Sequence, residues 1–323
     1  MNSALLVLAL SAGCLLAVQG GLNNTLRTVI RAPVGTALIS FVSGLAILVA
    51  LMFVTGEGVP GGKTLGDVPW WAFTGGTWGV FGVVGTILLV PRLGAATTVA
   101  VNIAGQMLMS LLLDAEGWLG VPQRDPGLLR LAGAVVVIVG ATLIAWQGSQ
   151  RALRTVATTA PRDEGLPTQP SRQFPAVRLV EVLFAFTIGA TMPTQAAINA
   201  RLRTELDAPF TASAISFGAG TLILILCVAM FANQRPRMDL VRTVPPWALL
   251  GGACGAFYVA SSVFLVPEFG AAITTALVVS GQNLASLAID HFGWLRLPRR
   301  RATIRRVVGV SLLLIGVLFV QFG

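Results

Sequence analysis

The sequence predicts an all-α polytopic membrane protein in which ten transmembrane helices form two inverted five-helix repeats. Three observations predict this fold class: an apolar composition, ten apolar runs of membrane-spanning length, and a match of the sequence to itself. Of the 323 residues, 55% are hydrophobic and only 11% are charged, whereas a soluble globular protein carries about 25% charged residues. Charge this sparse cannot cover a water-exposed surface, so lipid is the expected solvent for most of the chain.

The apolar runs are each about 20 residues long, which at about 1.5 Å per helical residue spans one hydrocarbon core. They lie at 3–22, 34–54, 70–90, 94–114, 128–147, 179–199, 210–231, 247–266, 270–290 and 304–322. The runs lack the two-residue alternation of barrel strands, and backbone groups in lipid must be hydrogen-bonded internally. We therefore expect helices. The first run has no positive charge before it and has a counterpart in mid-chain, which argues against a signal peptide.

A polar segment rich in proline and threonine divides the chain nearly in half. Residues 149–178 carry five arginines and two acidic residues, a composition that predicts a flexible linker in water. The expected organisation is a first five-helix repeat at 1–150, a polar cytoplasmic linker at 151–176, and a second, inverted repeat at 177–323.

The chain aligns with itself at an offset of 176 residues, without a gap, from the first run to the fifth. The motif V-P-x-x-G-A-A at 90–96 returns at 266–272, and G-Q-x-x-x-S-x-x-x-D at 105–114 returns at 281–290. Shared apolar composition would not keep this register across the loops, so the sequence indicates a duplication. Each unit has an odd number of spans, so the second unit must be inserted upside down relative to the first. Inverted repeats are the architecture of alternating-access transporters, which hold the substrate between the two halves.

Basic residues are distributed unequally between the two faces of the predicted membrane domain. Of the 22 lysines and arginines, 17 lie on the face that carries the linker and five lie on the other. Because basic loops stay in the cytoplasm, we expect a multi-pass protein of the plasma (inner) membrane with a cytoplasmic linker and both termini extracytoplasmic.

Polar residues recur at four-residue spacing inside four of the apolar runs, which places each set on one face of a helix. Such residues are costly in lipid and indicate either a polar cavity or contacts between helices. The candidate substrate-binding residues are Gln19, Asn23, Asn102, Gln106, Ser110, Gln195, Asn199, Gln282 and Ser286. For the long amides the cavity is the favoured interpretation, and for the two serines helix packing is favoured. Amides both donate and accept hydrogen bonds, which suits a neutral or zwitterionic solute.

Two aspartates, Asp114 and Asp290, end the stripes on the fourth and ninth runs beside a Gly-Trp pair. Inversion places them near opposite faces of the membrane rather than at its midplane. We expect an interfacial ion pair or a coupling role, with Arg27 and Arg203 as the nearest basic partners on the polar stripes. Glu181, which the repeat aligns with a leucine, is interpreted as interfacial.

Other classes of function lack support in the sequence. The cysteines (Cys14, Cys227 and Cys254) lie inside apolar runs without a Cys-x-x-Cys motif, and the single histidine, His291, has no partner at metal-ligand spacing. We therefore expect no metal and no cofactor, and we find no catalytic constellation that would make the chain an enzyme. The net charge of +9 reflects loop arginines rather than a nucleic-acid surface.

The motif Q-x-x-x-N-x-x-L-R near the end of the first run, together with the two repeated motifs and the Gly-Trp pairs, resembles the YdcZ branch of the drug/metabolite transporter (DMT) superfamily. That branch is typically a single five-span unit, and this chain is similar to two such units fused in tandem. The resemblance implies an inner-membrane exporter of small metabolites or drugs. A passive channel for a small solute or ion is the alternative that shares the architecture. The expected partners are a small-molecule substrate and the lipid bilayer, with the chain acting as a monomer or a homodimer.

Overall fold

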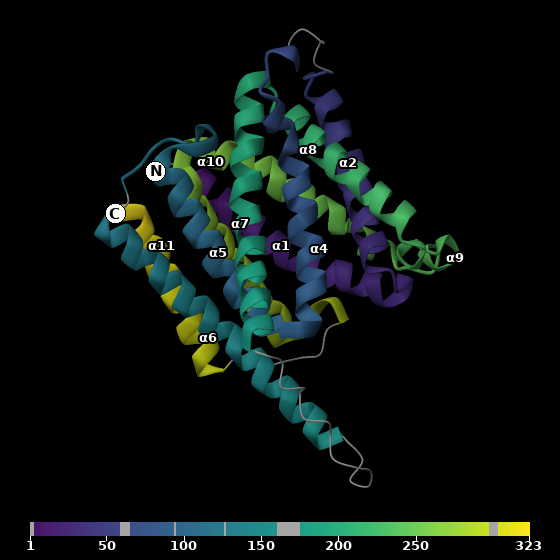
Figure 1. Ribbon diagram of the computed structural model, residues 1–323, viewed down its shortest axis with the longest axis vertical. Helices are drawn as coiled ribbons and strands as arrows, with labels where there is room; N and C mark the ends of the chain where they lie inside the picture. The colour runs from purple at the N-terminus through teal and green to yellow at the C-terminus, as the bar shows by residue number, and fades with distance from the viewer. Residues whose placement is uncertain (1–2, 59–64, 94, 126, 160–174, 297–302) are drawn as a thin grey trace.

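A computed structural model describes the chain except for residues 1–2, 59–64, 94, 126, 160–174 and 297–302. Helices make up the fold (Figure 1), and no strand occurs among the described residues. The first unit contains α1 (Ser3–Ile30), α2 (Pro33–Val54), α4 (Gly75–Leu93), α5 (Ala95–Glu116) and α6 (Leu128–Thr159). The second contains α7 (Pro175–Leu206), α8 (Pro209–Met230), the short α9 (Met238–Val241), α10 (Gly251–Phe292) and α11 (Ile304–Phe322). Short 3-10 turns precede α4 (Trp70–Thr74) and α10 (Pro246–Leu250).

Length and apolar composition qualify six described helical segments to cross a membrane, and α10 with its preceding turn counts as one of them. The six are Ser3–Ile30, Pro33–Val54, Thr97–Glu116, Leu179–Leu206, Pro209–Met230 and Pro246–Phe292. Two shorter apolar helical segments, Leu128–Leu143 and Val307–Phe322, correspond to the fifth and tenth predicted runs. The all-α polytopic fold class predicted from the sequence is confirmed.

The two halves of α10 are separate helices that meet at a break. Gly270 has φ 78° and ψ 173°, a conformation that side-chain-bearing residues rarely adopt. The eighth and ninth predicted runs therefore follow each other with a single-residue hinge between them, and the repeat places Gly94 at the equivalent position between α4 and α5.

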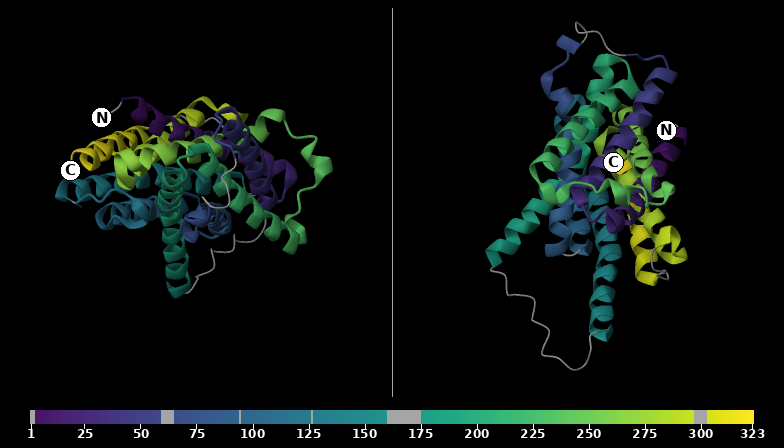
Figure 2. Two further views of the ribbon diagram at one scale, coloured as in Figure 1. Left: turned by 90° about the horizontal axis from the view of Figure 1, so that it is seen from above. Right: turned by 90° about the vertical axis from the view of Figure 1, so that its right-hand side faces the viewer.

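The linker is shorter than the sequence predicts, because α6 continues to Thr159 and α7 begins at Pro175. Residues 151–159 contain alanine, leucine and arginine, which favour helix, and no proline appears before Pro161. The end of α6 extends beyond the other helices at the bottom of Figure 1 and in the right-hand view of Figure 2. The centre of the predicted linker, 160–174, lies outside the described residues.

Equivalent helices of the two units pack against each other in opposite directions. At the contact of α2 with α8, the beginning of each helix lies beside the residues that follow the end of the other, and the rings of Phe41 and Phe217 meet with centroids 5.0 Å apart. In the α6–α11 pair, Gly133 lies against Gly316 and Gly140 against Gly309, and Figure 1 shows the two helices side by side. Antiparallel packing of equivalent helices means that the two units are inverted relative to each other.

Each unit supplies the helix cap that its partner lacks. Neither α2 nor α8 has a side-chain cap of its own. Glu57, after α2, accepts hydrogen bonds from the backbone N–H groups of Phe210 (3.2 Å) and Thr211 (2.7 Å) at the start of α8. Gln234, after α8, accepts one from Val34 (3.2 Å) at the start of α2. Helix N-termini have unpaired N–H groups that such acceptors satisfy, so the α2–α8 contact is held at both of its ends.

The first helix of each unit packs mainly on the other unit. A Cβ atom added to Gly13 on α1 would overlap the backbone of α10 at Val278, and one added to Gly189 on α7 would overlap the backbone of α5 at Asn102. Such close approach of helix backbones requires glycine and is typical of helices packed in membranes. The two units are therefore interlocked rather than laid side by side.

Candidate functional site

The amide stripe of α7 lies against a glycine face on α4. Gln195 is 5% exposed and Asn199 is fully buried. A Cβ atom on Gly79 would stand 2.7 Å from Gln195 Nε2, and one on Gly75 would overlap Asn199 Oδ1. These two amides therefore fill the space that the glycines leave between helices of different units.

The amide stripe of α1 repeats this contact on the second unit. A Cβ atom on Gly255 would stand 2.7 Å from Gln19 Nε2, and one on Gly251 would overlap Asn23 Oδ1. All four amides predicted from the helix 1 motif thus face glycines of the opposite unit, a placement that fits the packing alternative better than a wide cavity.

Several polar atoms at these contacts are buried without a hydrogen-bond partner in the described part of the chain. They are Asn199 Oδ1 and Nδ2, Asn23 Oδ1, Ser216 Oγ and Ser40 Oγ. Ser216 lies near Asn199 beside Gly75, and Ser40 lies near Asn23 beside Gly251. Buried polar groups in proteins are usually paired, so these two equivalent clusters stand out from the apolar core around them.

Two members of the α5 stripe make hydrogen bonds that leave them little freedom to bind a solute. Oriented by the hydrogen bonds it can make, the Asn102 amide donates to the carbonyl oxygens of Ala185 on α7 (2.6 Å) and Thr98 (3.2 Å). Ser110 is fully buried and donates to the Met107 carbonyl oxygen of its own helix (2.9 Å). Asn102 bridges the two units, and Ser110 packs, as favoured for the serines.

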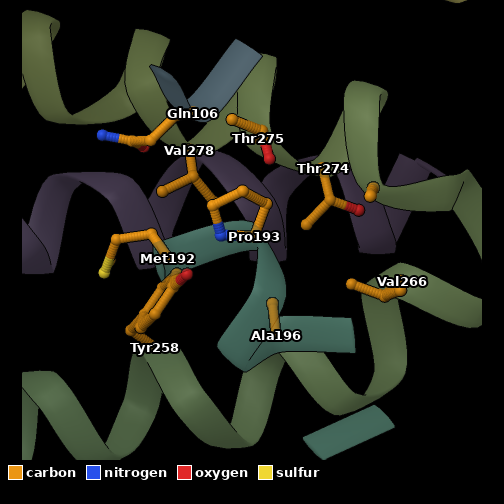
Figure 3. A pocket seen from close by; sticks show the side chains of 10 residues that line it. Gln106, Met192, Pro193, Ala196, Tyr258, Val266, Thr274, Thr275 and Val278 are labelled. Carbon is orange, nitrogen blue, oxygen red and sulfur yellow. The ribbon is translucent and has the colours of Figure 1, made fainter. Parts of the chain in front are cut away.

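A small cavity lies where α5, α7 and both halves of α10 meet (Figure 3). Its lining residues are Gln106, Met192, Pro193, Ala196, Tyr258, Val266, Ala271, Thr274, Thr275 and Val278. The cavity volume is about 10 Å³, which is room for about one water molecule. Of the predicted substrate-binding residues Gln106 lines it, whereas Gln282 and Ser286 lie one and two helical turns beyond Val278 on α10.

The polar part of the lining consists of the amide of Gln106 and three hydroxyls, and no lining residue is charged. The hydroxyls belong to Tyr258, Thr274 and Thr275, none of which lies on a predicted polar stripe. Tyr258 could have been recognised as a candidate from the sequence, because it is the single tyrosine of the chain and lies within an apolar run. Figure 3 shows its hydroxyl directed toward Met192 from the helix opposite Thr274 and Thr275.

Two irregularities in the helices adjoin this cavity. Pro193 interrupts the hydrogen bonding of α7, since proline has no N–H to donate. Gly270 breaks α10 beside Ala271, a lining residue. Breaks of this kind in membrane helices are tolerated where they line a cavity or are buried in protein, and substrate sites are often built at them.

Asp114 has a different partner from the arginines that the sequence suggested. It is 1% exposed and accepts hydrogen bonds from the backbone N–H groups of Ala271 (2.6 Å) and Ala272 (3.1 Å). Arg203 instead lies over the ring of Phe264, with 5.3 Å from Cζ to the centroid, and Arg27 is exposed. The expected ion pair of Asp114 with Arg27 or Arg203 is therefore wrong, because the free N–H groups behind the Gly270 break offer the carboxylate better-placed donors.

Glu181, predicted to be interfacial, is buried against neighbouring helices. It is 6% exposed, its Oε1 lies 3.8 Å from Arg92 Nη1, and its Oε2 has no hydrogen-bond partner in the described structure. Its position inside an apolar run was the available signal, since ionisable residues in membrane helices are rare and often functional. Among the described residues, no group of three His, Cys, Asp or Glu side chains could hold a metal ion.

These features define a multi-pass α-helical membrane protein with inverted repeats and an uncharged cavity between them. The family described as "Putative inner membrane exporter, YdcZ" matches the chain twice, over residues 4–143 and 180–319. The chain belongs to this family, and the resemblance based on the sequence motifs is confirmed.

Two further comparisons agree with the duplication and the fold. The inner membrane protein YdcZ of Escherichia coli (strain K12) is 34% identical over 154 residues, which are 97% of that protein and 45% of this chain. A solved crystal structure matches 100% of this chain and 98% of its own with a TM-score of 0.69 at 15% identity. At that identity the likeness concerns the fold alone. The chain is thus an inner-membrane protein about twice as long as its bacterial relative.

Proposed function

We propose that this chain is a secondary transporter that exports a small neutral or zwitterionic solute across the inner membrane by alternating access. The observation that carries the proposal is the cavity between the units, lined by one amide, three hydroxyls and apolar side chains. Binding sites for small molecules combine mostly apolar walls with a few polar groups. A strongly charged solute would need a charged partner, and none lines this cavity.

The cavity must widen to admit a solute, because it has room for about one water molecule. Pro193 in α7 and Gly270 in α10 provide two places at its wall where a helix can bend. Movement at these breaks would enlarge the space between the units without disrupting a complete helix.

We assign the polar residues two roles within this mechanism. Gln106, Tyr258 and Thr275 contact the solute, and Gln282 and Ser286 extend the polar path along α10. The Thr274 hydroxyl donates to the Gly270 carbonyl oxygen of its own helix (2.7 Å), so it can act toward the solute only as an acceptor. The second role belongs to the amides that lie on glycine faces of the opposite unit, which are Gln19, Asn23, Gln195 and Asn199. They form the polar contacts between α1 and α10 and between α7 and α4, the helix pairs that move when the cavity opens to one side or the other.

A direct test begins with a thermal-shift screen of metabolites and drugs on the purified protein, followed by flux of the stabilising compounds in proteoliposomes. We expect saturable flux and exchange of labelled for unlabelled solute across the bilayer. Flux that rises linearly with concentration and shows no exchange would instead support the passive channel.

The topology part of the proposal has its own test. With the native cysteines removed, a cysteine in place of Gly165 in the linker should resist a membrane-impermeant thiol reagent in intact cells, because the basic residues favour a cytoplasmic linker. The same cysteine should react in inverted membrane vesicles. Rapid labelling in intact cells would place the linker outside and the termini inside.

A further inference from the structure

A residue from the other unit accepts hydrogen bonds from the backbone at the break in α10. Both oxygens of Asp114, near the end of α5, accept hydrogen bonds from the first two N–H groups after Gly270, those of Ala271 and Ala272. A Cβ atom on Gly270 would stand 2.9 Å from each of these oxygens. Glycine is therefore needed here both for the positive φ and for the approach of the carboxylate.

This contact forms part of the wall of the cavity. Ala271 lines the cavity and also donates to Asp114, while Val266 lines it on the other side of the break. The loop after α5 adds two bonds at the same place: Arg124 donates from its backbone N–H to the Asp114 carbonyl oxygen (2.7 Å) and from Nη2 to the Glu268 carbonyl oxygen (2.8 Å). The first unit is thus bonded to the second at the break, on one side of the cavity.

The Asp114 contact lies on the side of the cavity that faces the C-terminus of the chain. Gly323 lies against Gly127 in the loop that follows α5, and Glu57 caps α8 on the same face, called here the termini face. The α2–α8 contact is capped at this face by Glu57 and at the opposite, linker face by Gln234. The α2–α8 contact can open at either face only if the cap at that face breaks. The Asp114 contact joins α5 to α10 at the termini face, and it lies beside the cavity.

We propose that Asp114 is the gate residue of the termini face: its release from the N–H groups of Ala271 and Ala272 opens the cavity to that side. The proposal rests on the proposed function. A carboxylate suits this role because water can satisfy it once the contact opens. While the gate is closed, the carboxylate is hydrogen-bonded and the cavity wall is continuous.

The repeat extends the gate to the linker face. Asp290 is equivalent to Asp114, and Ala95 and Ala96 are equivalent to Ala271 and Ala272. Asp290 is partly buried, and we extend the proposal to it by this equivalence: it is assigned the same role on the linker face. Two gates of one design on opposite faces are what an inverted repeat would use to open alternately.

The test measures access to the cavity and needs no substrate. In a background with Cys14, Cys227 and Cys254 replaced by alanine, Thr275→Cys reports access from either side of the membrane to an impermeant thiol reagent. Adding Asp114→Asn should raise the labelling rate from the termini face about tenfold, as loss of one charge-assisted hydrogen bond allows. Adding Asp290→Asn should raise it from the linker face instead.

Glu57→Gln is the matched control, because it weakens a carboxylate cap on the same face that does not adjoin the cavity. Equal labelling rates in the Asp114→Asn and Glu57→Gln proteins would overturn the gate. If Asp114→Asn does not accumulate in the membrane, Arg124→Gln, at a partly exposed position, removes the neighbouring bond to Glu268; no rise in labelling there also overturns the gate. Solute flux is measured in the same variants with Thr275 retained, because Thr275 belongs to the proposed solute site. Faster labelling together with no flux in these proteins would keep the gate and reject the transporter, whereas saturable flux with unchanged labelling would reject the gate alone.

Discussion

Replacing Gly76 with alanine is expected to destabilise the membrane domain strongly. A Cβ atom at this position would overlap the Ser216 carbonyl oxygen on α8 and would stand 2.6 Å from the Gly220 backbone nitrogen. Both obstacles are backbone atoms of another helix, so no side-chain rotation relieves the overlap, and the α4–α8 contact must separate. Overpacking of this kind costs about 1–3 kcal/mol. The measurement is the midpoint of thermal unfolding in detergent, together with the amount of protein in the membrane.

Gly218→Ala is the control for this prediction. Gly218 lies on α8 within two residues of both Ser216 and Gly220, yet a Cβ atom there meets no atom within 4 Å. Its substitution should leave the unfolding midpoint unchanged or raise it slightly, since alanine favours helix more than glycine does. A Gly76→Ala protein as stable as the Gly218→Ala protein would mean that α4 and α8 do not approach each other this closely.

Most of the fold follows from two sequence patterns, the apolar runs and the repeat at 176 residues. The runs predict the helices because lipid requires internal hydrogen bonding, and the repeat predicts inversion because five is odd. The extension of α6 past residue 150 was missed because a polar helix that continues into water carries no hydrophobic signal. The packing of α1 on α10 and of α7 on α4 was also missed, because a periodic pattern shows which residues share a face but not which helix covers it.

The candidate site, like the fold, follows from the sequence only in part. Of the residues on the repeated polar stripes, Gln106 lies beside the cavity, whereas Ser110, for which packing was the favoured interpretation, is bonded to its own helix. The hydroxyls of Thr274 and Thr275 attracted no attention, because threonine is common in membrane helices and often bonds its own backbone. The partner of Asp114 could not be foreseen, because it is a pair of backbone N–H groups exposed by the positive φ of Gly270. A contact of that kind depends on tertiary geometry rather than on residue type.

Replacing Gln106 with leucine should leave the protein folded and inserted while reducing transport about fivefold, a factor that the loss of a hydrogen bond worth about 1 kcal/mol explains. Gln106 lines the cavity and makes no side-chain hydrogen bond within the described structure, so its amide is available to a solute. Leucine has similar volume and no polar atom to bury, so packing should tolerate it. The measurements are the initial rate of solute flux per folded molecule in proteoliposomes and the midpoint of thermal unfolding.

Two substitutions on the same polar pattern serve as comparisons. Ser110→Ala, one turn along α5, removes a hydroxyl that bonds its own helix, and it should change neither flux nor stability by much. Gln282→Leu, at the equivalent position of the second unit, replaces an amide one turn beyond the cavity lining, so a smaller loss of flux is expected. If Gln106 only packs helices together, the opposite result should appear: a lower unfolding midpoint with flux per folded molecule preserved. Equal flux in the Gln106→Leu and Ser110→Ala proteins would remove Gln106 from the solute site, because the cavity would then bind its solute without the single amide that lines it.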